Sequence, residues 1–272
     1  MGSMKVFDLF PFFNELALLE LRVAELGPVV TRFGMVELPV TFTDKPKPLY
    51  YSELPHHKQH KDIFIHVPPT YPSGPHPTVD WFQRGQLWRL AAGAFPDDVI
   101  MLSDVDEIPD RTFVQKYIDD DVQHPMTFKM KLFYHRVDLM DRAPWLGTVI
   151  CRRKNLGREP NMQELREHRS TFPQIDGGWH FSWLGDAKAI ATKLEAVDIL
   201  RENAIYGAAG IEPPDEDPAF LQSCYETGVD LFGRKDRPKT RVPIVPGVNQ
   251  PHEIVAWLEK YPQYAAVDTV PY

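Results

Sequence analysis

A short apolar run, Val99–Leu102, leads directly into the segment Ser-Asp-Val-Asp-Glu-Ile-Pro at residues 103–109. Apolar runs of this length that end in polar residues and proline are typical of buried strands. Asp104 and Asp106 follow at spacing i and i+2, and side chains at this spacing in extended backbone point to the same side. The segment therefore predicts a buried strand that carries two neighbouring carboxylates at its carboxyl end.

Strand and helix patterns alternate on the amino-terminal side of this run and just beyond it. We predict strands at residues 5–10, 29–38, 63–67 and 99–103, and helices that start from a cap at Asn14, cover 79–94, and cover 111–121 behind a cap at Asp110. This order predicts an α/β fold with a mostly parallel central sheet flanked by helices. Later in the chain we predict strands at 126–134, 148–152 and 181–184, and helices at 186–199, 219–227 and 254–260.

Composition limits the class of protein. The 272 residues are 43% hydrophobic, which is enough for a substantial core, and the formal charge of -8 argues against a general nucleic-acid binder. No run of 18 apolar residues is present, and two cysteines are too few for a disulfide framework. We read residues 1–3 as an expression scar and the next residues as an amphipathic pattern, not a signal peptide. These features lead us to expect a cytoplasmic protein without a membrane span.

The carboxyl ends of the predicted parallel strands are the expected ligand site, since ligands of open α/β sheets bind there. Asp104 and Asp106 are oxygen donors of the kind that Mg²⁺ or Mn²⁺ prefers, and Glu107 adds a third carboxylate beside them. Carboxylates crowded in this way repel one another unless a cation neutralises them. We expect a nucleotide to lie across these strand ends, and the other residues expected to form the wall that contacts it are Phe10, Pro11, Asn14, Glu37 and Arg84.

A second motif, Gly-Gly-Trp-His-Phe-Ser-Trp, occupies residues 177–183. Backbone N–H groups of Gly177 and Gly178 are candidates for holding phosphate oxygens, and Trp179 is a candidate for stacking on a sugar or a base. His180 is a candidate metal ligand or diphosphate donor. A tight turn with core aromatic residues explains the same motif equally well. Lys45 and Lys47 lie next to prolines in a rigid, basic loop that could touch phosphate, but we favour an exposed loop.

Several segments in the same order resemble glycosyltransferase family 17. They are DLFPFFNELALLEL at residues 8–21, Lys-Pro-Leu at 47–49, SDVDEIP at 103–109 and GGWHFSW at 177–183, and the resemblance covers roughly residues 5–200. It implies a GT-A type fold, UDP-N-acetylglucosamine or another UDP-sugar as donor, inversion at the anomeric carbon, and Asp104 with Asp106 as the metal-binding pair. We expect one such domain over residues 4–272, with its nucleotide-binding part at about 4–125 and its acceptor side at about 126–272.

An inverting transferase needs a base on the face opposite the leaving group. Asp186 is the first candidate, because it precedes a predicted helix just after the glycine-tryptophan motif, and Asp176, Glu216 and Asp217 are rivals. The expected acceptor is a glycan or glycoconjugate hydroxyl, and the negative charge ranks nucleic acid below it. Two other hypotheses stay open: a non-catalytic nucleotide- or carbohydrate-binding module, and a metal-dependent nucleotide-sugar phosphohydrolase.

Overall fold

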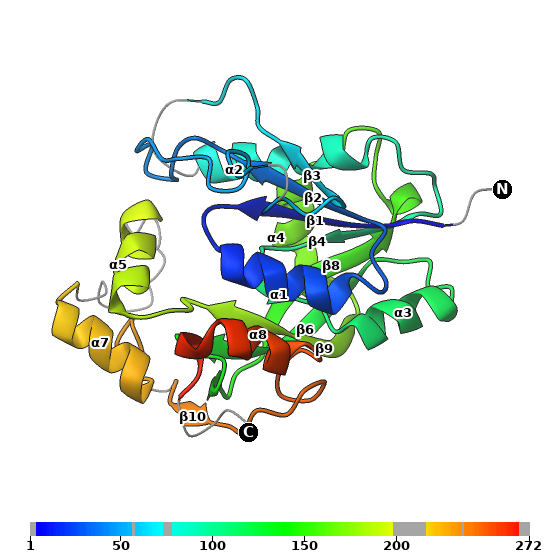
Figure 1. Cartoon of the computed structure of the whole chain (residues 1–272). Helices are drawn as coiled ribbons and strands as arrows, with labels where there is room; N and C mark the ends of the chain where they lie inside the picture. The colour runs from blue at the N-terminus through cyan, green and yellow to red at the C-terminus, as the bar shows by residue number, and fades with distance from the viewer. Residues whose placement is uncertain (1–3, 56–57, 73–77, 198–215, 236, 267–272) are drawn as a thin grey trace.

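The computed structural model describes the chain except for residues 1–3, 56–57, 73–77, 198–215, 236 and 267–272 (Figure 1). In the described part, ten strands join in one sheet. They are β1 (Val6–Phe12), β2 (Arg32–Glu37), β3 (Ile63–His66), β4 (Val99–Leu102), β5 (Glu107–Ile108), β6 (Met126–Tyr134), β7 (Leu139–Asp141), β8 (Trp145–Arg152), β9 (Gln174–Ser182) and β10 (Lys239–Arg241). The α-helices are α1 (Leu16–Leu26), α2 (Thr78–Gly85), α3 (Arg111–Asp119), α4 (Met162–Glu167), α5 (Ala187–Ala196), α7 (Pro218–Thr227) and α8 (Ile254–Lys260), and the 3-10 turns are η2 (Leu87–Ala91), η3 (Arg153–Asn155), η4 (His168–Thr171) and η5 (Pro262–Tyr264).

The predicted parallel arrangement is confirmed in the amino-terminal half of the sheet. Strands β4, β1, β2 and β3 lie side by side in that order, and each neighbouring pair is parallel. Antiparallel pairing begins at β8, which lies against β4, and continues to β6, β7 and β10. Strand β9 runs parallel to β6 and also pairs with the two-residue strand β5. The carboxyl ends of β1 and β4 therefore meet at one edge, as the α/β prediction requires.

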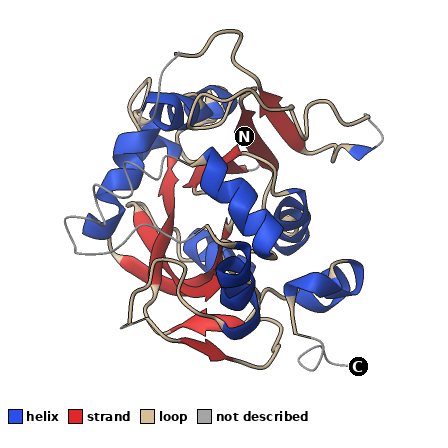
Figure 2. Ribbon diagram, turned by 90° about the vertical axis from the view of Figure 1, so that its left-hand side faces the viewer, coloured by secondary structure: helices blue, strands red, loops and turns tan. Residues whose placement is uncertain are grey.

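Both faces of the central strands are buried, which explains why β1 and β4 read as continuous apolar runs. Phe10 and Met101 face one side, in a cluster that includes Leu19 of α1. Leu9 and Ile100 face the other side, in a cluster that includes residues of η2 and α4. Figure 1 shows α1 in front of the sheet and α4 behind it, and Figure 2 shows helices on both sides of the strands. The sheet is thus the middle layer of three.

Several predicted boundaries are wrong for local reasons. Helix α1 is preceded by Glu15, not capped by Asn14, and the Glu15 carboxylate instead accepts from the backbone of the two residues before it. The helix predicted over 79–94 divides into α2 and η2 after Gly85. Strand β9 starts seven residues earlier than the predicted strand at 181–184. The predicted cap at Asp110 is confirmed, since its side chain accepts from the backbone N–H of Thr112.

Some expectations concern features that the described residues show only in part. The helix predicted over 186–199 ends at Ala196, and the end predicted for it lies outside the described residues. Cys151 and Cys224 are both buried and free. Among the helices that the structure describes, none combines the length and the apolar character needed to cross a bilayer.

A buried histidine at the end of β6 makes stability depend on pH. His135 is fully buried, and burial lowers its pKa from 6.5 to about 4. The unfolded chain therefore takes up a proton near pH 6.5 while the folded chain stays neutral, so stability is lost as pH falls from about 6.5 toward 4. We expect this site to remove about 2 kcal/mol of unfolding free energy between pH 7 and pH 5.

The variant His135→Asn tests this expectation by urea denaturation at both pH values. Asn tolerates the positive φ of 64° that this position requires. The variant should lose less stability on acidification than the wild type, whereas His124→Asn, at an exposed histidine, should lose as much. Equal losses in the His135→Asn variant and the wild type would contradict the assignment.

Candidate functional site

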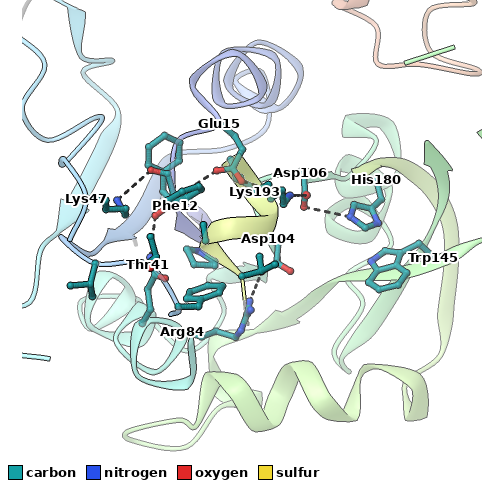
Figure 3. A pocket seen from close by; sticks show the side chains of 18 residues that line it. Phe12, Glu15, Thr41, Lys47, Arg84, Asp104, Asp106, Trp145, His180 and Lys193 are labelled. Carbon is teal, nitrogen blue, oxygen red and sulfur yellow. Dashed lines mark hydrogen bonds and ion pairs between the residues drawn. The ribbon is translucent and has the colours of Figure 1, made fainter. Parts of the chain in front are cut away.

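A cleft of about 800 Å³ opens at the carboxyl ends of β1 and β4 (Figure 3). Its walls come from the chain after β1, the loop after β2, helices α2 and α5, and the segment that follows β4. The lining residues are Pro11, Phe12, Phe13, Glu15, Val40, Thr41, Phe42, Lys47, Gln83, Arg84, Asp104, Val105, Asp106, Trp145, His180, Lys193, Ala196 and Val197. Both carboxylates of the Asp-Val-Asp motif lie in this cleft, together with several cationic side chains.

The loop that carries the two aspartates is held from behind by Arg22 of α1. The Arg22 guanidinium is fully buried and forms a two-pronged ion pair with Asp8 of β1, with N···O distances of 2.6 and 2.7 Å. Its remaining N–H groups donate to the backbone oxygens of Asp104 and Glu107 at 3.0 and 2.6 Å, and to the Ser103 hydroxyl at 2.5 Å. One buried cation therefore sets the path of the loop between β4 and β5.

Asp104 is neutralised by the chain itself. Its Oδ1 accepts from Nη1 of Arg84 at 2.5 Å, and its Oδ2 pairs with Nη2 of Arg166 on α4. Burial alone would raise the pKa of Asp104, but the charges of Arg166 and Arg84 outweigh it and hold this pKa well below its usual range. Both carboxylate oxygens of Asp104 are thus engaged by arginine.

Glu107 is a structural member of the same network and does not line the cleft. It is fully buried, and Arg166 donates to its two oxygens at 2.9 Å each. Trp145 donates its indole N–H to Glu107 at 2.6 Å, and the backbone N–H of Asp104 donates to it at 3.0 Å. The repulsion predicted among the three carboxylates is therefore relieved by Arg84, by Arg166 and, at Asp106, by Lys193.

Asp106 faces Lys193 of α5 and His180 of β9 (Figure 3). Lys193 Nζ lies 3.3 Å from Oδ2 of Asp106, and His180 Nε2 lies 3.6 Å from Oδ1. Burial would raise the pKa of Asp106, but the neighbouring charges of Lys193 and His180 lower it to about 2. The pairing of β5 with β9 places His180 opposite Glu107, and Phe181 N–H donates to Asp106 O at 2.9 Å.

The predicted metal set of Asp104, Asp106 and His180 fits a divalent cation in part. Oδ1 of Asp106 and Nε2 of His180 face each other at 3.6 Å, which exceeds hydrogen-bonding distance and suits two ligands of one cation. The oxygens of Asp104 already meet two arginines. Asp106 and His180 are thus the side chains that fit such an ion.

Another group of potential ligands lies outside the cleft. Glu25, Asp110 and His252 bring one ligand atom each within 4.8 Å of the others. In the described residues, this is the one group of three or more His, Cys, Asp or Glu side chains whose ligand atoms lie this close together. Glu25 already accepts from the His252 backbone at 2.8 Å and lies 2.9 Å from its ring Nδ1. The group joins α1 to the segment before α8.

Lys47 and Trp145 complete the cleft; Trp145 was not singled out from the sequence, and for Lys47 an exposed loop was favoured over contact with phosphate. The interpretation of Lys47 as exposed is wrong: its side chain is 5% exposed, with its Nζ 4.0 Å from Glu37. Burial lowers the pKa of Lys47 despite the nearby carboxylates. The Trp145 ring lies 4.7 Å from the His180 ring, centroid to centroid. A lysine between prolines and a tryptophan at a strand start carry no sequence pattern that marks them as cleft residues.

The predicted nucleotide wall is divided by the structure. Pro11 and Arg84 line the cleft as expected. Phe10 is fully buried beneath it, with its ring 4.7 Å from the Arg22 guanidinium carbon. Glu37 is also fully buried, and it accepts from the backbone N–H groups of residues 51 and 52. Asn14 lines an adjoining cleft. Phe10 and Glu37 therefore support the wall and do not form its surface.

The paired glycines are not brought to the cleft. Gly177 and Gly178 lie within β9, where an added Cβ would come within 2.6 Å of the Phe113 ring and 2.7 Å of the Ile108 carbonyl, respectively. They line a separate cavity on the β6 side. Trp179 is 1% exposed and packs in the core, so its ring is not free to stack on a sugar. Close packing explains the Gly-Gly-Trp triplet, and His180 is the residue of the motif that reaches the carboxylates.

None of the four predicted bases lines the Asp104–Asp106 cleft, among the residues that the structure describes. Asp186 and Asp217 accept from backbone N–H groups as the caps of α5 and α7. Asp176 is 83% exposed and pairs with Lys129, and Glu216 is exposed beside Asp217. The carboxylate that sequence reasoning missed is Glu15, which lines the cleft at the start of α1.

Comparison with known proteins agrees with the resemblance drawn from the motifs. The profile of glycosyltransferase family 17 matches residues 2–198, so the chain belongs to this family. It is 24% identical over 253 residues to the beta-1,4-mannosyl-glycoprotein 4-beta-N-acetylglucosaminyltransferases of Rattus norvegicus and Homo sapiens. Each alignment covers 79% of this chain and 46% of the relative. The chain thus spans about half the length of the curated relatives it matches.

Solved structures superpose only in part. TarS of S. aureus aligns at a TM-score of 0.38 and 13% identity, covering 98% of this chain and 81% of that chain. The inositol-1-phosphate CTP transferase of T. maritima aligns at a TM-score of 0.38 and 11% identity, covering 72% of this chain and 99% of that chain.

Proposed function

We propose that this protein is an inverting glycosyltransferase that moves a sugar from a UDP-sugar, N-acetylglucosamine being the expected one, to a hydroxyl of a glycan-like acceptor. The observation that carries the proposal is the joint placement of Asp104 and Asp106 in a cleft at the carboxyl ends of β1 and β4. Family membership and the names of the relatives support the sugar and the acceptor class.

The cleft offers separate surfaces for the parts of such a donor. Phe13 and Phe42 line the cleft and are partly exposed, so their rings suit an aromatic base. Arg84, Lys47 and Lys193 line the same cleft and suit a diphosphate, because they donate charged hydrogen bonds. The side chains of the three cations are held by carboxylates, which orient them before the donor arrives.

We further propose dependence on Mn²⁺ or Mg²⁺, with Asp106 and His180 as the side chains that would hold the ion. The 3.6 Å separation of their facing atoms supports this assignment. When bound, the cation would supply positive charge to the departing diphosphate. Lys193, next to Asp106, adds a second positive charge on the same side. Burial would lower the pKa of Lys193, but Asp106 and Glu15 raise it, which keeps the lysine protonated.

The test is to incubate the protein with a panel of UDP-sugars and Mn²⁺, and to measure UDP release with and without acceptors such as p-nitrophenyl β-D-mannopyranoside. A transferase releases UDP faster when its acceptor is present. A phosphohydrolase would instead cleave the diphosphate with water and release UMP and a sugar phosphate, at the same rate with and without acceptor. A non-catalytic binding module would bind the donor and release no UDP, and either outcome would overturn the proposal.

Lys47 provides a prediction on donor affinity. Replacing it with Met removes a nearly buried positive charge from the cleft, where charge interactions are stronger than in water. We expect the Kd for UDP-N-acetylglucosamine to rise about 10- to 100-fold, or ~1.4–2.8 kcal/mol. Isothermal titration measures this Kd. Lys45→Met, an exposed lysine of the same loop, is the matched control and should leave it unchanged. An unchanged Kd in Lys47→Met would remove this lysine from the donor site.

A further inference from the structure

A second cleft, of about 1210 Å³, adjoins the first on the α1 and α5 side. We call it the aromatic cleft, because Tyr261 and Tyr264 line it opposite Asp186 and Thr192. Asn14, which was predicted to contact the nucleotide, also lies here. The two tyrosines lie beyond residue 198, where the match to the family profile ends. This wall therefore comes from a part of the chain that the match does not reach.

The aromatic wall is rigidly supported. Tyr264 stacks on Trp257 of α8 with a centroid distance of 5.1 Å and an interplanar angle of 18°. Trp257 in turn donates its indole N–H to the backbone oxygen of Ala17 at 2.7 Å, which ties α8 to α1. Tyr261 and Tyr264 are both partly exposed. Aromatic rings beside a few polar groups are the usual lining of a small-molecule site.

Two residues belong to both clefts, and one of them is a carboxylate. Glu15 and Lys193 line both the aromatic cleft and the first cleft, which contains Asp104 and Asp106 and which we call the donor cleft. Oε2 of Glu15 accepts from the backbone N–H groups of Phe13 and Asn14 at 3.3 and 3.1 Å, while Oε1 lies 3.9 Å from Lys193 Nζ. Figure 3 shows Glu15, Lys193 and Asp106 in succession along the cleft. Among the described lining residues, Glu15 is the carboxylate shared by the two cavities.

A base for glycosyl transfer has to reach the acceptor hydroxyl while that hydroxyl faces the donor sugar. It therefore has to stand where the donor and acceptor sites meet. Asp186 lines the aromatic cleft but not the first cleft, and its side chain already caps α5. Asp104 and Asp106 line the donor cleft but not the aromatic cleft. Asp104 faces arginine, and Asp106 faces lysine and histidine. Glu15 is the carboxylate with access to both sides.

We infer that the aromatic cleft receives the acceptor sugar, and that Glu15 is the general base; this inference rests on the proposed function. The acceptor hydroxyl gives its proton to Oε1 of Glu15, and its oxygen forms a bond to the anomeric carbon. The bond between that carbon and the diphosphate oxygen breaks, and the diphosphate oxygen keeps the electron pair. Lys193, between Glu15 and Asp106, positions the carboxylate.

The first test is Glu15→Gln, measured as UDP release from UDP-N-acetylglucosamine with Mn²⁺, to water and to the acceptors of the panel. Because Gln keeps the shape but cannot take the proton, turnover should fall about 100-fold or more, with the donor Kd within about twofold of wild type. Glu159→Gln, at an exposed glutamate that lines neither cleft, is the matched control and should keep wild-type turnover. The assignment of the base is overturned if Glu15→Gln keeps wild-type turnover, or if Asp186→Asn loses turnover to this extent and Glu15→Gln does not.

The second test addresses the acceptor cleft. Tyr264→Ala should raise the KM for p-nitrophenyl β-D-mannopyranoside about 10-fold or more and leave the KM for the donor unchanged, whereas Tyr264→Phe, which keeps the ring, should behave as wild type. An unchanged acceptor KM in Tyr264→Ala overturns this placement. If the wild-type protein neither binds nor cleaves UDP-N-acetylglucosamine, the proposed function itself is contradicted, before any variant is compared.

Discussion

Asp106→Asn is expected to reduce the rate of UDP release from the donor about 10³-fold, equivalent to ~4 kcal/mol of transition-state stabilisation. The substitution removes one negative charge and keeps the shape of the side chain. Asp106 faces Lys193 at 3.3 Å and His180 at 3.6 Å, so its loss disturbs both the lysine proposed to contact the diphosphate and the pair proposed to hold the metal. Steady-state turnover with saturating UDP-N-acetylglucosamine and Mn²⁺ measures the effect.

The matched control for this variant is Asp97→Asn. Asp97 precedes β4, at the opposite end of the strand from the cleft, and its side chain is 78% exposed beside Lys154. This variant should retain wild-type turnover. If Asp106→Asn kept turnover within tenfold of wild type, the carboxylate would not take part in the reaction.

Arg22→Met is expected to lower the free energy of unfolding by about 3–5 kcal/mol, since it leaves the Asp8 carboxylate buried without its charged partner. The same substitution removes the donors to the backbone oxygens of Asp104 and Glu107. We therefore expect donor binding to be lost together with stability, although Arg22 lies outside the cleft. Urea denaturation and donor titration measure the two effects.

The double variant Asp8→Leu with Arg22→Met separates these effects. Replacing both members of a buried ion pair with apolar residues is often close to neutral for stability. The double variant should regain much of the lost unfolding free energy, but not donor binding, because the loop at residues 103–107 still lacks its anchor. Recovery of both properties would show that Arg22 serves stability alone.

Local patterns in the sequence were sufficient to predict the parallel strands β1 to β4 and the edge at which their carboxyl ends meet. The apolar run before Asp104 predicts β4, and the cap at Asp110 predicts the start of α3, because both signals involve neighbouring residues. His180, predicted as a metal ligand or diphosphate donor, lies 3.6 Å from Asp106, and its role stays a prediction. Gly177 belongs to the same motif, but β9 places it against the Phe113 ring and not in the cleft.

Contacts between distant residues could not be predicted in the same way. Arg166 pairs with Asp104 across 62 positions, and Arg22 reaches Asp104 across 82. An arginine on a helix face carries no local mark that distinguishes a buried partner from a solvated one. Glu15 was overlooked for a related reason, since a glutamate before a helix is usually a surface residue. Its position between two clefts emerges only from the packing of α1 against α8 and from the approach of Lys193 on α5.

The most direct test of the account is a crystal structure of the protein with UDP-N-acetylglucosamine and Mn²⁺, with anomalous diffraction used to locate the manganese. We predict a manganese peak within coordination distance of Asp106 and His180, with the diphosphate beside Arg84, Lys47 and Lys193. A manganese peak at Glu25, Asp110 and His252, or a nucleotide bound in the cavity beside Gly177 and Gly178, would contradict it.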